Sequence, residues 1–408
     1  MKFFFPDSQD QVDPYFDFET ETTAEFRVRQ RDDRYAHEVL APPAYDGLLV
    51  SKPIVDGLAG ASGKYTLAQR HRLHRLGVHS FFRLEQAGRR LFAMGDCGSF
   101  TYVREAEPPY SVEEVIGFYE GCGFDYGISV DHVVLGWDVT DTSPELPEWR
   151  RRQNLSLDLA ARFLDQHDRR NSRFVPLGAA QGWSPASYAE SVGRLQDMGY
   201  SYIALGGMVP LKTPQILEAL EAVRPVLRPG TQLHLLGVSR GATLPGLGAY
   251  GVTSLDSTTP FRQAFKDDKD NYYWWGRNFA ALRVPQVDGN AKLKAAIRAG
   301  RVDQDSARRM ERQCLEALRR FDRGAESVQH VVEAVHEYAQ LHGDPVDRRS
   351  QARELLEEAP WKQCDCAICR QVSIEVIIFR GTERNKRRGF HNLHIFNARL
   401  AVNGSPVG

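Results

Sequence analysis

From about residue 45 to 260 the chain alternates short apolar runs with amphipathic helical patterns, separated by turn residues. Repeated strand–helix units with short connections predict a parallel sheet covered by helices. Val112, Val115, Ile116 and Tyr119, for example, follow the i, i+3, i+4, i+7 spacing of a helix between two such runs. The expected strands lie at Leu48–Ser51, Leu91–Gly95, Tyr126–Asp131, Phe174–Leu177, Tyr202–Leu205, Leu233–Gly237 and Val252–Leu255.

Seven strands suit either a (β/α)8 barrel or a doubly wound sheet. Polar residues stand at or just past the ends of several strands, namely Asp96, Asp131, Gln181 and Asp256. A barrel builds its site on the whole rim of strand ends, whereas an open sheet gathers it at one switch point. The sequence therefore predicts an α/β fold of the (β/α)8 TIM-barrel type.

The chain has 408 residues, more than the roughly 250 of one such barrel. It carries 52 Lys+Arg against 53 Asp+Glu, which argues against a protein coated in nucleic acid but allows one local basic groove. No apolar stretch approaches the roughly 18 residues that span a bilayer. The apolar run at the start of the sequence is too short for a signal peptide. We therefore expect a cytoplasmic protein without membrane contact.

The composition changes after residue 265. The next segment opens with the charged run 266–270 and the aromatic run Tyr272–Trp275, and continues as charged, helix-patterned sequence. The aromatic residues could stack on bases, but packing within a helical insertion is the simpler interpretation. We predict a barrel core at 1–265, a charged helical insertion at 266–362, and a zinc-binding subdomain with the C-terminal end at 363–408.

The zinc prediction rests on Cys364, Cys366 and Cys369, a C-x-C-x2-C pattern followed by His391 and His394. Three thiolates and one imidazole make the closed tetrahedral set of a structural zinc site. Three reduced cysteines on a loop are the alternative, and spacing alone does not choose between the two histidines. Because a closed site has no open position for water, we expect it to hold structure and not to catalyse.

A basic run from Arg380 to Arg388 shortly precedes His391. It is either a solvated surface turn or, beside a zinc module, a patch that contacts phosphate. Its candidate nucleic-acid-binding residues are Arg384, Lys386, Arg387 and Arg388.

Two acids stand at strand ends in distinctive surroundings. Asp96 lies in a tight turn flanked by glycines, and Asp256 begins the segment Asp256-Ser257-Thr258-Thr259-Pro260. One acid at a strand end is commonly a helix cap, but several on one rim indicate a site. Two carboxylates with distinct roles are what glycosidic-bond chemistry requires, because one attacks the anomeric carbon and the other moves protons.

Taken in order, these segments resemble the motifs of the tRNA-guanine transglycosylase superfamily. The similar segments are Asp96-Cys97-Gly98-Ser99-Phe100 (D-S-G-G-F), Asp131 (F-D-E), Gln181-Gly182 (V-Q-G-G), Ala204-Leu205-Gly206-Gly207-Met208 (G-G-L-A), Leu255-Asp256 with Thr259-Pro260 and Arg262 (F-D-C-V-x-P-T-R), and the three cysteines with His391-Asn392-Leu393 (H-N-L). The resemblance covers most of residues 45–265 and 361–395.

The resemblance implies a role for each matching residue. Asp256 would be the nucleophile and Asp96 the group that transfers protons. The base would be bound by Asp131, Gln181, Gly206 and Gly207, the nucleic acid by Arg262 as well as the basic run, and zinc by Cys364, Cys366, Cys369 and His391.

Three departures resemble the branch of this superfamily that places 7-deazaguanines in DNA. The insertion before Cys364 is long, the loop at Val209–Lys212 lacks an acid, and the chain stops soon after the H-N-L segment. We therefore expect a pentosyltransferase that exchanges guanine in DNA for a 7-deazaguanine, with 7-cyano-7-deazaguanine (preQ0) as the incoming base. A structural zinc, no organic cofactor, and helper proteins of a DNA-modification system accompany this expectation.

Two competing hypotheses remain open. The first is the same chemistry on tRNA. The second is a catalytically silent, zinc-containing subunit that binds nucleic acid, although the presence of both Asp96 and Asp256 speaks against silence.

Overall fold

The computed structural model describes residues 1–7, 9–58, 63–238, 246–266, 270–341 and 346–403. The chain forms two compact units. A barrel unit comprises Met1–Gln9, Tyr45–Thr258 and Asn397–Gly408, and a second unit comprises Asp10–Ala44 and Thr259–Phe396. The three segments expected from the sequence stay a prediction of domain organisation. Two parts of these predicted segments lie outside the described residues, namely 267–269 of the charged run and 404–408 of the C-terminal end.

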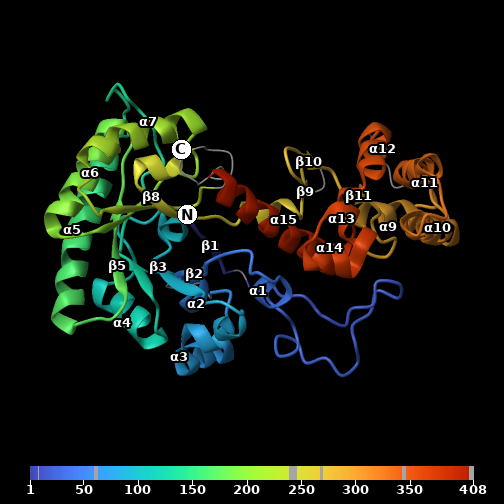
Figure 1. Cartoon of the computed structure of the whole chain (residues 1–408), viewed down its shortest axis with the longest axis horizontal. Coiled ribbons are helices and arrows are strands. Elements are labelled where there is room, and N and C mark those ends of the chain that lie inside the picture. Colours follow the sequence, from blue (N-terminus) through green and yellow to red (C-terminus); the bar gives the residue numbers. More distant parts are fainter. Residues whose placement is uncertain (8, 59–62, 239–245, 267–269, 342–345, 404–408) are drawn as a thin grey trace. The chain divides into compact units, whose positions relative to one another are not determined.

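The barrel unit contains a closed ring of eight strands in chain order, each parallel to its neighbours, which confirms the predicted TIM barrel (Figure 1). All seven expected strands are present; β6 has the predicted bounds, and the borders of the others are shifted by one to three residues. The strands are β1 (Lys2–Pro6), β2 (Gly47–Ser51), β3 (Phe92–Asp96), β4 (Tyr126–Ile128), β5 (Val175–Ala180), β6 (Tyr202–Leu205), β7 (Gln232–Leu235) and β8 (Val252–Asp256).

Strand β1 was missed by the sequence analysis, which considered the first residues only as a targeting segment. Its apolar core is the short run Phe3–Phe5, and a run of three residues shows no periodicity. In the structure, β1 pairs with β2 on one side and β8 on the other, and so closes the ring. Phe3 and Phe4 are fully buried.

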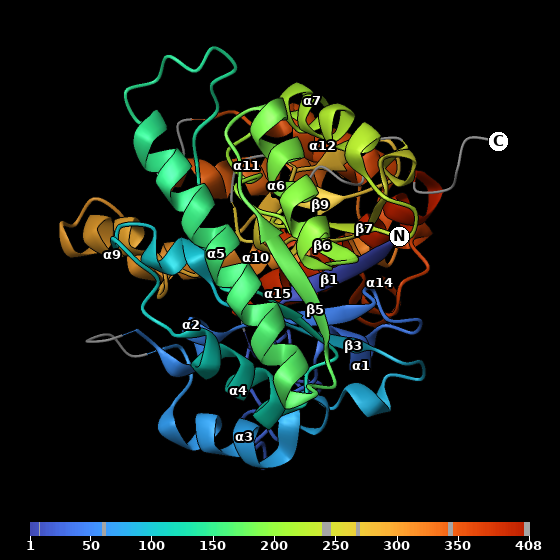
Figure 2. The ribbon, with the colours of Figure 1, turned by 90° about the vertical axis from the view of Figure 1, so that its left-hand side faces the viewer.

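Helices surround the ring of strands, as Figure 2 shows for α5 and α6 outside β5 and β6. Their starts follow local chemistry: Ser111 and Ser184 accept hydrogen bonds from first-turn amides of α4 and α6. The helices of this unit are α2 (Lys52–Asp56), α3 (Leu67–Phe81), α4 (Val112–Cys122), α5 (Leu146–Arg170), α6 (Pro185–Met198) and α7 (Thr213–Val223), with 3-10 turns η1 (Leu84–Gln86), η2 (Ser99–Tyr102), η3 (Arg224–Val226) and η5 (Leu247–Tyr250).

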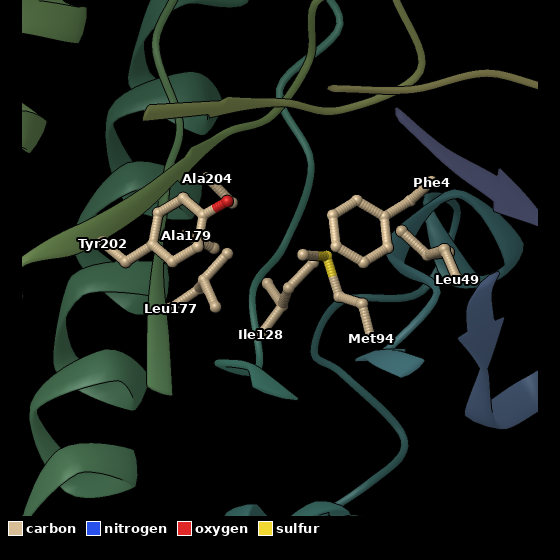
Figure 3. Packing of buried hydrophobic residues seen from close by; sticks show 8 residues of the cluster. All are labelled: Phe4, Leu49, Met94, Ile128, Leu177, Ala179, Tyr202 and Ala204. Atoms are coloured by element: carbon tan, nitrogen blue, oxygen red, sulfur yellow. The ribbon is translucent and has the colours of Figure 1, made fainter. Parts of the chain in front are cut away.

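The interior of the barrel is a packed core and not a channel (Figure 3). Six strands, β1 to β6, contribute to it, because each strand turns alternate side chains inward. The buried members are Phe4, Leu49, Met94, Ile128, Leu177, Ala179, Tyr202 and Ala204. This filled interior leaves the strand ends as the place for chemistry.

The second unit is mainly helical and contains two small sheets. Its strands are β9 (Tyr272–Tyr273), β10 (Asn278–Phe279), β11 (Leu282–Arg283) and β12 (Ile378–Phe379), and its helices are α1 (Ala36–Val39), α8 (Thr259–Gln263), α9 (Ala291–Arg298), α10 (Gln304–Asp322), α11 (Val328–Leu341), α12 (Arg349–Glu358), α13 (Pro360–Gln363), α14 (Ala367–Val372), the 3-10 turn η6 (Ser373–Ile377) and the start of α15 (Gly381–Asn403). Among the residues described, no helix combines the length and apolar character needed to cross a membrane.

Candidate active site and metal centre

The five barrel segments singled out from the sequence all reach the same rim. Asp96 is the last residue of β3 and Asp256 the last of β8. Asp131, Gln181 and the Gly206–Gly207 pair follow β4, β5 and β6. In a parallel barrel the carboxyl ends of all strands share one face, so the fold brings these distant residues to one site.

Asp96 is half-buried and accepts a hydrogen bond from the Ser51 hydroxyl at 2.6 Å. Burial raises the pKa of Asp96, and the nearby negative charge of Asp256 raises it further. The Ser51 hydroxyl and the Gly98 amide oppose this rise. A carboxyl with a raised pKa can carry a proton closer to neutral pH, which suits proton transfer.

Asp131 is fully enclosed by its neighbours. The Cys97 thiol donates to one carboxylate oxygen at 2.9 Å, and the Gln181 amide donates to the other at 2.5 Å. Burial raises the pKa of Asp131 to about 6, and the charge of Asp96 adds to the rise. Cys97 matches a serine of the family motif, and its thiol keeps a donor at that position.

The Gln181 side chain is locked at both ends of its amide. Its oxygen accepts from the Val134 amide at 3.1 Å while its nitrogen donates to Asp131. A Cβ on Gly206 would lie 2.1 Å from the Gln181 amide nitrogen, and a Cβ on Gly207 would lie 2.2 Å from the Val134 carbonyl oxygen. Gly207 also has φ +71°, so both positions require glycine.

Asp256 is 6% exposed. Described residues donate two hydrogen bonds to it, and both go to the same carboxylate oxygen. Oδ1 accepts from the Gly237 amide at 2.9 Å and from His234 Nε2 at 3.2 Å. His234 is fully buried on β7 and was missed by the sequence analysis, as was Ser51. The available signal was one polar residue within the apolar run Leu233–Leu235.

The predicted metal ligands come together in the second unit. Cys364, Cys366, Cys369 and His391 are buried, and their ligand atoms all lie within 4.8 Å of one another. His391 Nδ1 is 3.5, 3.6 and 3.3 Å from the three sulfur atoms. A tetrahedral zinc, with Zn–S about 2.3 Å and Zn–N about 2.0 Å, requires S···N separations of roughly 3.5 Å. The cluster could therefore hold zinc.

Neighbouring groups orient the histidine for this role. His391 Nε2 donates to the Tyr273 carbonyl at 2.7 Å, which leaves Nδ1 free to face the sulfur atoms. The Tyr272 ring stacks on the His391 ring, with centroids 4.2 Å apart and an interplanar angle of 10°. Part of the aromatic run at Tyr272–Trp275 thus packs against the Cys–His cluster. His394 lies outside the cluster and faces Asp365 at 3.5 Å.

The basic run differs from its predicted role. Arg384, Arg387 and Arg388 are at most 2% exposed and bond within the second unit. Arg384 donates to Glu375 at 2.7 Å, and Arg388 donates to the Val376 and Ile378 carbonyls at 3.1 and 3.2 Å.

Arg387 is bonded in the same way, to the side chain of Glu383 and the carbonyl of Asp13. Lys386 is half-buried and donates to the Gln11 carbonyl at 2.7 Å. These donors form hydrogen bonds within the second unit. They do not form the exposed phosphate-binding patch that the sequence predicted. Arg262 is exposed.

Comparison with known proteins decides the family. No family model matches the chain. The sequence is 50% identical over 407 residues to a DNA-guanine transglycosylase of Salmonella montevideo, and the match spans 98% of this chain and 96% of that protein. The chain belongs to the DNA-guanine transglycosylase family.

This membership confirms the resemblance to the tRNA-guanine transglycosylase superfamily and to its DNA-modifying branch. The family consists of pentosyltransferases, enzymes that exchange bases. Since the match runs through nearly the whole chain, the second unit is shared with the Salmonella transglycosylase and is not an addition peculiar to this sequence.

Proposed function

We propose that this chain exchanges guanine in DNA for a 7-deazaguanine, with 7-cyano-7-deazaguanine as the incoming base. One observation carries the proposal. Asp96 and Asp256 end two strands of one closed barrel in a chain that is 50% identical to a DNA-guanine transglycosylase. Two carboxylates on one rim supply the nucleophile and the proton carrier that exchange at a glycosidic carbon requires.

The first half of the exchange removes guanine. The target nucleotide leaves the base stack, since C1′ cannot be attacked inside a duplex. Asp256 forms a bond to C1′ as the C1′–N9 bond breaks. The electron pair of the C1′–N9 bond passes to the departing guanine. Asp96, whose pKa is raised by burial, delivers the proton that makes guanine a better leaving group.

The second half installs the new base. N9 of the 7-deazaguanine attacks C1′ from the vacated side, the bond to Asp256 breaks, and the N9 proton passes to Asp96. Two displacements retain the configuration at C1′. Asp131, Gln181 and the backbone at Gly206 and Gly207 bind the base edge, and exposed Arg262 contacts a backbone phosphate.

The metal centre takes no part in these steps. Cys364, Cys366, Cys369 and His391 would hold one structural zinc, which as a closed four-ligand site supplies stability to the second unit. Their buried, mutually facing ligand atoms support this assignment.

The proposal is tested by mass spectrometry of digested DNA and tRNA from cells that express the chain and make 7-cyano-7-deazaguanine. Modified deoxynucleosides should appear in DNA. A modified base found in tRNA alone would move the enzyme to the tRNA branch. Denatured DNA should also retain a covalently bound peptide that contains Asp256.

Two variants sharpen this test. Asp256→Asn preserves shape but removes the attacking charge, so exchange should fall at least about a thousandfold and the adduct should vanish. The control is Asp165→Asn, which changes an acid exposed on helix α5. An adduct that maps to Asp96 would reverse the two roles, and normal exchange by Asp256→Asn would refute the mechanism.

A further inference from the structure

A line of hydrogen bonds runs inward from Asp256 into the barrel. His234 Nε2 lies 3.2 Å from Asp256 Oδ1, and His234 Nδ1 lies 2.6 Å from the Ser254 hydroxyl. The Ser254 hydroxyl in turn pairs with the Tyr202 hydroxyl at 2.5 Å. His234 and Ser254 are fully buried, and Tyr202 is 4% exposed.

The chemistry of each group fixes the direction of this line. An ionised carboxylate only accepts, so His234 Nε2 carries the hydrogen that points to Asp256. In the neutral ring Nδ1 then accepts from Ser254, and the Ser254 oxygen accepts from Tyr202. Every donor therefore points toward Asp256, and successive hydrogen bonds of this kind polarise one another.

The local backbone brings His234 to this position. Strands β7 and β8 pair in regular register on either side of a shift between Leu233 and His234. Such an irregularity re-aims a side chain. After the shift His234 stands opposite Ser254, while Phe4 of β1 packs edge-on against the His234 ring at 6.0 Å.

We infer that His234 is a positioning residue for the nucleophile and selects Oδ2 of Asp256 as the oxygen that bonds to C1′. This inference rests on the proposed function. His234 and the Gly237 amide both bond to Oδ1, so among the described residues Oδ2 is left without a donor. When Oδ2 attacks C1′, the C1′–N9 pair leaves with guanine, and Oδ1 becomes the carbonyl oxygen of the ester.

The same hydrogen bond favours release of the ester. A charge-assisted hydrogen bond to a carboxylate is stronger than a bond to a neutral ester carbonyl. His234 therefore stabilises Asp256 more when it is free than when it carries the sugar. As the incoming base attacks C1′, the C1′–Oδ2 pair returns to a carboxylate that His234 and Gly237 already stabilise.

The test measures adduct formation and adduct breakdown separately, with purified full-length chain, single-stranded DNA and labelled guanine as the incoming base. His234→Phe should lower the ratio of breakdown rate to formation rate by about tenfold, so that the adduct accumulates. His234→Gln, which can still donate to Asp256, should restore much of the ratio. Ser254→Ala and Tyr202→Phe should show smaller shifts in the same direction.

Tyr200→Phe is the matched control, since the buried Tyr200 hydroxyl bonds to the Ala160 carbonyl at 2.8 Å, outside the line. It should leave the ratio unchanged. A folded His234→Phe, verified by its melting temperature, that keeps the wild-type ratio overturns the inference and leaves the proposed function intact. Adduct formation by Asp256→Asn would instead refute the proposed function.

Discussion

The barrel rim and the cluster of Cys364, Cys366, Cys369 and His391 are both assembled from buried or half-buried groups that can carry charge, but they differ in how fully those groups are bonded. At the rim, Asp256 receives its bonds from described residues on Oδ1 alone, and burial raises the pKa of Asp96. In the cluster, four ligand atoms face one another, and the outer nitrogen of His391 is bonded to Tyr273.

The difference separates reactivity from stability. A group with a displaced pKa, or with an oxygen that receives no hydrogen bond from the described residues, is poised to exchange a proton or a bond. A buried group whose every direction is occupied contributes to holding the fold. The buried arginines of the second unit are closer to this second kind, because most of their donors bond within that unit, although Nε of Arg387 and Nε of Arg388 have no hydrogen-bond partner among the described residues. Substitutions in the two regions should therefore fail in different ways.

The largest effect is expected from Cys366→Ser. Loss of one thiolate should remove the proposed zinc, and because the binding energy of a structural zinc is part of the folding energy, the second unit should lose several kcal/mol of stability. Elemental analysis and urea unfolding measure the two consequences. Cys314→Ala, which alters a buried cysteine of α10 outside the cluster, should keep its metal. Full zinc content in Cys366→Ser would break the distinction.

Asp96→Asn should show the opposite pattern. Exchange should fall by about a hundredfold or more because guanine leaves poorly without a delivered proton. The free energy of unfolding should stay within about 1 kcal/mol of wild type, since the replacement is neutral and of equal size. Single-turnover kinetics and urea unfolding on one preparation make the comparison. A variant that keeps its activity but unfolds early would assign Asp96 to the fold.

Arg388→Met tests whether the buried arginines stabilise. The side chain is fully buried, burial lowers its pKa to about 9, and its removal leaves the Val376 and Ile378 carbonyls without these donors. We expect a loss of about 3 kcal/mol in the free energy of unfolding. Arg277→Gln, at an exposed ion pair with Glu354, should cost less than about 1 kcal/mol. Equal losses would contradict the assignment.

The smallest effect depends on pH and concerns Asp131. Its pKa is raised from 3.8 to about 6, so burial favours the protonated form, and the associated stability is lost as the pH rises through 6. Asp131→Asn does not titrate. The unfolding free energy of wild type should therefore fall relative to the variant by roughly 2 kcal/mol between pH 4.5 and 7.5. If the difference in unfolding free energy between wild type and variant did not change with pH, the pKa of Asp131 would not be raised in the folded protein.

Much of this architecture could be predicted because it follows from local sequence patterns, such as cysteine spacing and short apolar runs. The spacing of Cys364, Cys366 and Cys369 predicted a cluster that the structure assembles, and strand β6 has the predicted bounds Tyr202–Leu205. The line from Asp256 to His234 could not be predicted, because it depends on a register shift between β7 and β8.

The basic run was misjudged for a similar reason. The density of basic residues in a segment does not reveal whether acidic partners for them lie in a distant segment of the chain. Glu21, which binds Arg380 and Arg384, stands far from both along the chain. Such tertiary pairing turns a run that resembles a phosphate site into part of the interior.

Strand β1 pairs Lys2 with Ser254 and Phe4 with Asp256, so about 250 residues must be made before the ring can close. At a translation rate of roughly 5–20 residues per second, the first strand waits on the order of 10–50 s for its last neighbour. During that interval β1 can pair with β2, but its other edge has no partner until β8 is made. Strand β8, which ends at Asp256, therefore pairs with β1 only when the ring closes, so the rim that carries Asp96 and Asp256 is complete only after that step.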